Sequence, residues 1–343
     1  MVGALVVHDG EVVGSGWHRQ VGGPHAELEA LAQAGSRARG ATLYVTLEPC
    51  SHQGRTPPCV DAVLAAGISR VVACHRDPNP RVSGRGFAAL RDAGVEVEVG
   101  ILAAQAVRLN LRFLIATTLG RPEVTLKWAM SLDGRIATAA GESRWISSPP
   151  ARRWALTLRE EHDAILVGSG TVLADDPRLD RRLHLAAGPN VRVVLDRRLR
   201  TPPEARLFTV KGPVLIYTEA SRERREALTA KGAEVIVLPE VEPPSVLADL
   251  HRRGIQSVLV EGGSEALASF VASGLFDRAM VDCAPLFIGG RGAPGPLGGA
   301  GFPALDEATR LEKLEAGRRG SDLLLVAYRQ GCLASLLEAV SGS

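Results

Sequence analysis

The chain has 343 residues, enough for two domains, and 45% of them are hydrophobic, which suffices for more than one core. Aromatic residues make up only 4%, so the cores should be aliphatic. A formal net charge of +2 with no block of like charge argues against a broad nucleic-acid-binding face and leaves room only for a local basic pocket.

The five cysteines are an odd number at low density, which argues against a disulfide framework and for a reducing compartment. Residues 1–14 lack the basic start, long apolar stretch and cleavage site of a signal peptide. No apolar run approaches the ~20 residues that span a bilayer. We therefore expect a cytoplasmic protein without a membrane segment.

The first third of the chain alternates short strands with helices, which predicts an α/β layered domain with a mainly parallel portion. Asp9-Gly10, between two apolar stretches, indicates a tight hairpin. The predicted strands are 3–9, 11–17, 42–47, 70–74 and 95–100, and the predicted helices are 26–36, 58–66 and 86–93.

A domain boundary is predicted near residue 120. Residues 101–118 carry helical apolar periodicity, and the Gly and Pro of 119–122 interrupt it. The boundary divides the chain into a first domain, 1–119, and a second domain, 120–343.

The second domain is again predicted to be α/β, with a Gly- and Pro-rich loop at 289–303 that we expect to be mobile. Its predicted strands are 123–129, 164–168, 191–196, 214–218, 234–238, 257–263, 278–285 and 322–329, its clearest helices are 149–161 and 264–274, and residues 171–182 are predicted to be a loop.

Four residues of the first domain form a pattern that carries chemistry: His25, Glu27, Cys50 and Cys59. One imidazole and two thiolates make a tetrahedral zinc set whose open position takes water, and zinc lowers the pKa of that water to ~7. Glu27 need not bind the metal, because its task is to carry the proton of water to a ring nitrogen and to the departing amine. This order of residues is the signature of zinc base deaminases, except that the usual gap of two residues between the cysteines is eight here.

Each of these residues taken singly has a simpler explanation. A histidine near a helix start is usually structural, and a lone cysteine is usually a small buried apolar group. The four together in this order rarely arise by chance, so we interpret them as a zinc site.

The stretches 22–31, 41–59 and 77–95 closely resemble the deaminase half of the bifunctional riboflavin-biosynthesis deaminase/reductase family, and the longer cysteine gap is that family's own pattern. The resemblance implies a cytidine-deaminase-like α/β/α domain. It also implies zinc ligation by His25, Cys50 and Cys59, with Glu27 as the proton shuttle.

The loop between the two cysteines should lie beside the metal, so His52 and Arg55 are expected to face a substrate. The forked donors of Arg55 suit the ribose phosphate of the family's substrate. Asp77 and Asn79 follow a strand end. They either contact the pyrimidine or sugar or serve as ordinary turn residues.

The stretches 126–148, 158–179 and 260–270 resemble the family's reductase half, a dihydrofolate-reductase-like α/β domain that uses NADPH. No Gly-x-Gly-x-x-Gly fingerprint follows a first strand, which argues against an ordinary Rossmann site. Gly262 and Gly263, between a strand and a helix, either hold a phosphate on free backbone N–H groups or simply make a tight turn. The resemblance favours cofactor binding.

The resemblance also implies individual contacts in the second domain. The implied NADPH contacts are Ala129, Trp145, Thr171 and Asp175, and the implied substrate contacts are Ser143, Arg159, Leu179, Arg182 and Glu261. Trp145 equally suits a core position, and the two arginines equally suit solvated surfaces. Lys127 lies in an otherwise apolar strand, and because an isolated buried ammonium is costly it should face the site.

These features predict a bifunctional enzyme that hydrolytically deaminates a diaminopyrimidinone ribosylamine phosphate and reduces its ribosyl group to ribityl with NADPH. The resemblance implies a homo-oligomer without nucleic-acid or membrane partners. The rivals are a reductase with a structural deaminase domain, a nucleic-acid-binding protein with a deaminase-like fold, and a metal-binding scaffold. Glu27 argues against the scaffold, since a structural zinc site needs no such carboxylate.

Family members carry a helix and an Asn-Pro loop before the strand that corresponds to 2–7, so we expect the natural chain to begin upstream of Met1. Loss of such a helix would expose several hundred Å² of sheet, worth several kcal/mol at ~25 cal/mol per Å². The other interpretation is that the C-terminal helix, 332–343, or a partner subunit covers that face.

Overall fold

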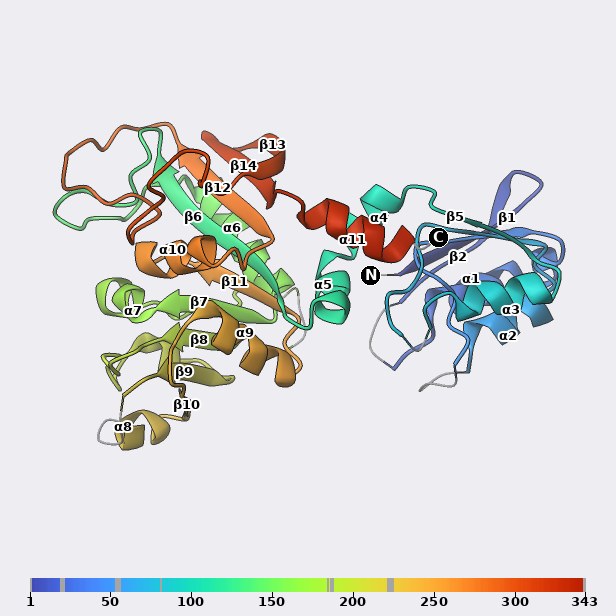
Figure 1. The fold of residues 1–343 in the computed structure, drawn as a ribbon, viewed down its shortest axis with the longest axis horizontal. Helices are drawn as coiled ribbons and strands as arrows, with labels where there is room; N and C mark the ends of the chain where they lie inside the picture. Colours follow the sequence, from blue (N-terminus) through green and yellow to red (C-terminus); the bar gives the residue numbers. More distant parts are fainter. Residues whose placement is uncertain are drawn as a thin grey trace. The chain divides into compact units, whose positions relative to one another are not determined.

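The computed structural model describes residues 2–18, 22–52, 57–80, 82–183, 185, 188–220 and 225–341. The chain forms two compact units (Figure 1). The first contains residues 1–119 together with 333–343, and the second contains residues 120–332. No helix in these described ranges is long and apolar enough to cross a membrane.

The first unit contains a five-stranded sheet in the order β2-β1-β3-β4-β5. Its strands are β1 (Gly3–His8), β2 (Glu11–Trp17), β3 (Thr42–Val45), β4 (Arg70–Ala73) and β5 (Glu96–Val99). The predicted hairpin joins β1 and β2: Asp9 and Gly10 both have positive φ, as a two-residue turn of this kind requires. The strands β3, β4 and β5 run parallel, which confirms the predicted mainly parallel portion.

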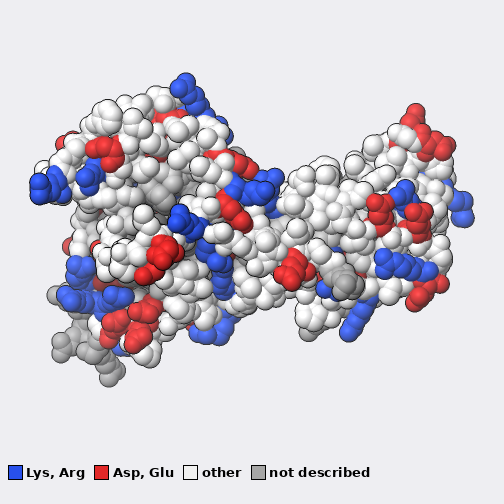
Figure 2. Space-filling model, turned by 45° about the horizontal axis from the view of Figure 1, so that its top comes forward, with Lys and Arg blue, Asp and Glu red and all other residues white. Residues whose placement is uncertain are grey.

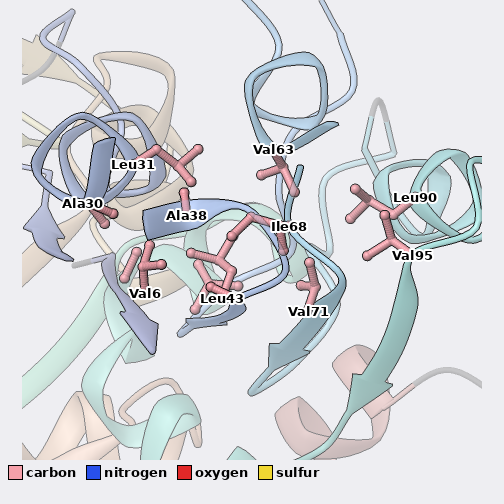
Figure 3. Packing of buried hydrophobic residues seen from close by; sticks show 14 of the residues in the cluster. Val6, Ala30, Leu31, Ala38, Leu43, Val63, Ile68, Val71, Leu90 and Val95 are labelled. Carbon is pink, nitrogen blue, oxygen red and sulfur yellow. The ribbon is translucent and has the colours of Figure 1, made fainter. Parts of the chain in front are cut away.

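Three helices pack on one face of this sheet: α1 (Ala26–Ala34), α2 (Cys59–Ala65) and α3 (Arg85–Asp92). Figure 3 shows how side chains from the helices and strands, such as Leu31, Leu43 and Val71, interlock in an aliphatic core. This core is aliphatic apart from Phe87, as the composition predicts, whereas a core cluster of the second unit also contains Tyr217, Phe270 and Phe276.

Helix α1 is held unusually close to β2. A Cβ atom added at Gly14 would lie 2.1 Å from the Ala30 carbonyl oxygen, and one added at Gly16 would lie 2.2 Å from that of Ala26. Only glycine leaves room for this contact between helix and strand backbones. The two glycines thereby fix the position of the first turn of α1, and with it His25 and Glu27, relative to β2.

The opposite face of the sheet is less completely covered, with Leu5 43% and Tyr44 39% exposed. The helical stretch after the sheet is divided at Asn110 into α4 (Ala103–Leu109) and α5 (Leu111–Thr118).

The C-terminal helix α11 (Cys332–Ser341) differs from the sequence expectation, which assigned everything after 120 to the second domain. From Leu333 onward it belongs to the first unit. Val340 is fully buried, and its carbonyl oxygen accepts a hydrogen bond from the backbone N–H of Arg76. This short terminal helix thus packs against residues more than 250 positions earlier in the sequence. A local sequence pattern cannot predict such a contact.

The second unit is built on a nine-stranded sheet in the order β10-β9-β8-β7-β11-β6-β12-β14-β13. Its strands are β6 (Glu123–Ser131), β7 (Ala164–Gly168), β8 (Val191–Leu195), β9 (Val214–Thr218), β10 (Ala233–Val237), β11 (Ser257–Glu261), β12 (Arg278–Ala284), β13 (Leu311–Arg319) and β14 (Asp322–Arg329). The seven strands from β10 to β12 are parallel, and β14 and β13 complete the sheet as antiparallel neighbours.

Helices cover both faces of this sheet (Figure 1). These helices are α6 (Pro149–Glu161), α7 (Ser169–Asp175), α8 (Arg225–Thr229), α9 (Pro243–Arg252) and α10 (Ser264–Ala272). On one face α9 and α10 pack on residues such as Leu126 and Val260, and on the other Leu158 of α6 packs on Leu259 and Met280.

Two parts of this unit differ from the sequence expectation. Helix α7 extends into the stretch predicted as a loop from 171, and β13 lies in a region where no strand was predicted. The loop 289–303 makes contacts with the rest of the unit: Pro294 accepts a backbone hydrogen bond from Ile136, and Ala293 is buried. Its mobility stays a prediction.

Candidate functional site

His25, Cys50 and Cys59 converge in the first unit. His25 is the residue immediately before α1, Cys59 is the first residue of α2, and Cys50 lies in the segment after β3. Nδ1 of His25 lies 3.1 Å from Sγ of Cys59 and 3.6 Å from Sγ of Cys50. The three ligand atoms all lie within 4.8 Å of one another, so residues up to 34 positions apart face a common point.

The two thiols have different electrostatic environments. Hydrogen bonds from the thiol and the backbone N–H of Cys59 lower the pKa of Cys50 to about 5, against the opposing effect of burial. The same sulfur–sulfur interaction, together with burial, raises the pKa of the Cys59 thiol. Two thiols this close share one proton. A cation that binds both sulfurs as thiolates is therefore favoured at this point.

This donor set fits a zinc ion. An imidazole and two thiols at mutual distances of a few ångströms match ligands that surround one ion at about 2.0–2.3 Å. With three protein donors, a fourth coordination position stays open for water, which is the arrangement of catalytic rather than structural zinc sites.

Glu27 lies in the first turn of α1 and is only 3% exposed. Burial raises the pKa of this carboxyl group. It hydrogen-bonds to Cys59, while its Oε2 atom has no hydrogen-bond partner among the described residues. A buried oxygen without a partner beside a metal-binding cluster is suited to accept a proton from a bound molecule.

Of the residues expected to face a substrate, Asp77 lies close enough to Cys50 and His52 for their charges to act on its carboxyl group. His52 is half-buried, and its Nδ1 atom has no hydrogen-bond partner within the described part of the chain. Arg55 lies outside the described residues. Asp77 is buried and accepts the backbone N–H of Asn79 at 2.8 Å, so the pair does make a turn, and burial raises the pKa of Asp77 to about 6.

In the second unit, Lys127 and Glu261 lie side by side on the neighbouring parallel strands β6 and β11. Arg159 of α6 binds Glu261 through two hydrogen bonds, 2.8 Å from Nε to Oε1 and 2.5 Å from Nη2 to Oε2. Burial lowers the pKa of Lys127, and Glu261 opposes the effect. These three expected site residues therefore form one cluster near the carboxyl ends of the strands, where ligands bind in open α/β sheets.

Two carboxyl groups that the sequence analysis did not select belong to the same face. Asp282 lies two residues after Met280, the β12 partner of Lys127, and Asp322 begins β14. Asp282 is 2% exposed, and its Oδ2 atom has no partner among the described residues. Asp282 is the one charged residue of the stretch 279–284, and this was the available sequence signal.

Burial raises the pKa of Asp282 to about 6, and the adjacent carboxylate of Asp322 adds to the effect. Because the pKa is higher in the folded than in the unfolded protein, the neutral form of Asp282 contributes stability that is complete below about pH 4 and is lost as the pH rises through about 6. Asp322 accepts the backbone N–H of Ser148 at 2.7 Å and stays the ionised partner.

Asp282→Asn should therefore stabilise the second unit at pH 8, by up to about 2 kcal/mol, and change little at pH 4. An amide resembles the protonated acid in shape and can donate to Asp322 at every pH. Thermal unfolding of both proteins between pH 4 and pH 8 measures the effect. A stability difference that does not grow with pH would contradict it, and the exposed Asp306→Asn is the matched control.

The turn between β11 and α10 consists of Gly262 and Gly263, both with positive φ. A Cβ atom added at Gly263 would lie 2.9 Å from Oγ1 of Thr171. Gly262 and Gly263 therefore do make a tight turn. This turn brings Thr171 of α7 close to the start of α10. Asp175, at the end of α7, forms an ion pair with Arg144 at 3.8 Å.

The remaining expected contacts are Ala129, Ser143, Trp145 and Leu179. Trp145 is 70% exposed and is covered on one side by Arg152, 4.6 Å from the ring centre, so it is not a core residue. Ala129 lies on β6, and Ser143 is half-buried in the loop that follows it. Leu179 is buried with positive φ.

Arg182 is exposed and pairs with Asp180 at 2.8 Å. The backbone oxygen of Asp180 also lies 3.5 Å from Nη1 of Arg159. The loop at 179–182 therefore brings Arg182 toward the cluster that contains Arg159, although most of the donor fork of Arg159 is directed to Glu261.

Comparison with protein families gives two matches, one within each unit. Residues 1–75 match the cytidine and deoxycytidylate deaminase zinc-binding region, and residues 122–325 match the RibD C-terminal domain.

Relatives match both halves together. The riboflavin biosynthesis protein RibD of Aquifex aeolicus is 44% identical and aligns over 96% of this chain and 92% of its own length. The RibD protein of Escherichia coli is 41% identical and aligns over 94% of this chain and 92% of its own length.

Solved structures agree. That of Acinetobacter baumannii RibD has a TM-score of 0.85 at 37% identity and covers 96% of this chain and 92% of its own. A diaminohydroxyphosphoribosylaminopyrimidine deaminase/5-amino-6-(5-phosphoribosylamino)uracil reductase from Thermotoga maritima has a TM-score of 0.82 at 36% identity, over 96% and 91%.

Proposed function

Since this chain belongs to the RibD family of riboflavin biosynthesis proteins, we propose that its first unit deaminates a diaminopyrimidinone ribosylamine phosphate and that residues 120–332 reduce the ribosyl group. The protein is a bifunctional deaminase and reductase that uses zinc and NADPH, and the predicted fold classes are confirmed. The observation that carries the deaminase assignment is the convergence of His25, Cys50 and Cys59 beside the buried Glu27.

We assign the zinc ion to His25, Cys50 and Cys59, where it supplies Lewis acidity toward a water molecule. Glu27 takes a proton from the attacking water and delivers it to the pyrimidine ring nitrogen. It then delivers the second proton to the departing amine, so that water is consumed and ammonia is released. His52, with its buried Nδ1, and the turn at Asp77 and Asn79 orient the ring and sugar, and Arg55 is proposed for the phosphate.

NADPH supplies the hydride for C1′ of the opened ribosylamine. We place its phosphates at the Gly262–Gly263 turn, where the first N–H groups of α10 lack partners within the helix. The further proposed cofactor contacts are Ala129, Trp145, Thr171 and Asp175.

The substrate of the reductase is proposed to bind at the cluster of Lys127, Arg159 and Glu261. Lys127 lies beside Glu261, the last residue of β11, and it stabilises negative charge on the sugar or its imine nitrogen. Arg182 offers an exposed guanidinium for the phosphate. Ser143 and Leu179 complete the proposed substrate contacts.

A small-molecule substrate fits this family better than a nucleic acid. Figure 2 shows Lys and Arg interspersed with Asp and Glu on the visible surface of each unit, without a broad basic face. The near-neutral net charge agrees with this view. We retain the family-based proposals of a homo-oligomer and of a protein without nucleic-acid partners.

Metal dependence tests the assignment of the first unit. Cys59→Ala should lose zinc and lower the melting temperature of the first unit, because metal binding contributes to the free energy of folding. Reduction of pre-deaminated substrate should continue at the parent rate. Metal content, calorimetry and both activities measure the outcome, with Cys74→Ala, outside the cluster, as the matched control.

Full zinc occupancy of the Cys59→Ala protein would remove Cys59 from the ligand set. Equal loss of both activities would contradict the assignment of deamination and reduction to separate units.

A further inference from the structure

Glu48 is a buried carboxylate to which neither the sequence pattern nor the proposed mechanism gives a role. It is 3% exposed and lies two residues before Cys50. Its Oε2 atom accepts the backbone N–H groups of Asp77 at 3.1 Å and Gly84 at 2.9 Å. Its Oε1 atom accepts those of Gly86 at 2.9 Å and Phe87 at 3.4 Å.

These four hydrogen bonds join three segments of the first unit. One is the turn from β3 to Cys50, the second begins at Asp77, and the third is the first turn of α3, whose N–H groups have no partners inside the helix. A negative charge is also favoured at this end of a helix dipole.

A close backbone contact also holds the start of α3 against the segment that leads to Cys50. A Cβ atom added at Gly86 would lie 2.0 Å from the carbonyl oxygen of Pro49, so α3 rests directly on the residue before Cys50. The φ angle of Gly86 is not in the left-handed region, so glycine is needed here for space.

We propose that Glu48 is a positioning residue of the deaminase site: it fixes the Asp77–Asn79 turn relative to Cys50, and so fixes the substrate relative to the metal. This inference rests on the proposed function, in which Cys50 is a zinc ligand and Asp77 and Asn79 contact the substrate. Glu48 touches neither substrate nor metal in this scheme and acts through the backbone of its neighbours.

The position of Glu48 between these three segments requires a carboxylate rather than any polar group of the same shape. Each oxygen of Glu48 faces two N–H donors. A glutamine side chain would direct its NH₂ group at two donors in either orientation, so Glu48→Gln loses two hydrogen bonds and opposes donors to donors. The turn and the helix start must then move away from the Cys50 segment.

The test compares Glu48→Gln and Gly86→Ala with the parent in the full chain, and the exposed Glu11→Gln serves as the control. Zinc content, the KM and kcat of deamination, and the rate of reduction are measured. We expect both variants to retain zinc and full reduction. Their KM for deamination should rise at least about tenfold, and kcat/KM should fall by about 10- to 100-fold, because a small displacement of bound substrate is costly.

Parent values of KM and kcat in a folded Glu48→Gln protein would overturn the proposal, even if its melting temperature fell, since Glu48 would then be merely structural. If Glu48→Gln does not fold, Gly86→Ala decides by the same criteria. A parent protein without deaminase activity would instead contradict the proposed function, so the two failures are distinguishable.

Discussion

Glu27→Gln is expected to lower the rate of deamination by at least about 100-fold while zinc binding and reduction stay at parent levels. The amide has the size of the carboxylate but cannot accept and release the proton of water. Since Glu27 is outside the ligand set His25, Cys50 and Cys59, the metal should remain. Steady-state deamination, zinc content and reduction of pre-deaminated substrate measure the three expectations.

Glu29→Gln is the matched control, because Glu29 lies on the same helix two residues on, half-buried and near the backbone of Trp17. It should deaminate at the parent rate. Deamination by Glu27→Gln at the parent rate would show that another group carries the proton. Loss of zinc from this variant would show that Glu27 acts on the metal site itself.

Lys127→Met is expected to lower the rate of reduction by about 100- to 1,000-fold and to leave deamination unchanged. Methionine preserves most of the apolar stem but removes the charge beside Glu261. Arg159 still neutralises Glu261, so the fold should not lose stability. Removing a desolvated ammonium, whose pKa burial lowers, can even raise the melting temperature.

Activity and stability therefore change in different directions in this variant. Single-turnover hydride transfer, followed by NADPH absorbance, and thermal unfolding are the two measurements. Lys211→Met, an exposed lysine of the same unit, is the matched control and should leave both unchanged. Reduction at the parent rate by Lys127→Met would exclude a role for the ammonium in catalysis.

The order of residues along the chain sufficed to select the three side chains that the fold brings within 4.8 Å of one another. This works because His25 and Cys59 lie at helix starts, whose positions local pattern predicts well. The alternation of strands and helices likewise predicts both sheets. The role of Glu27 remains a prediction, although its burial and unpartnered oxygen agree with it.

Elements stabilised by distant partners were not predictable. Strand β13 is mostly exposed and has no apolar alternation, because it is an edge strand whose paired neighbour in the sheet is β14. From Leu333 onward, helix α11 belongs to a unit whose other residues end at Leu119. Asp282 differs from a surface aspartate only through the strands that bury it, and the register of β12 on β6 is a property of the folded sheet.

The most direct test of two activities in one chain is incubation of the purified protein with the diaminopyrimidinone ribosylamine phosphate, with and without NADPH, followed by mass spectrometry. Without NADPH, the product should differ from the substrate by replacement of one amine with oxygen. With NADPH, the product should carry that change and two added hydrogens. A product that gains the hydrogens but never loses the amine, or a substrate that stays unchanged in both reactions, would contradict the account.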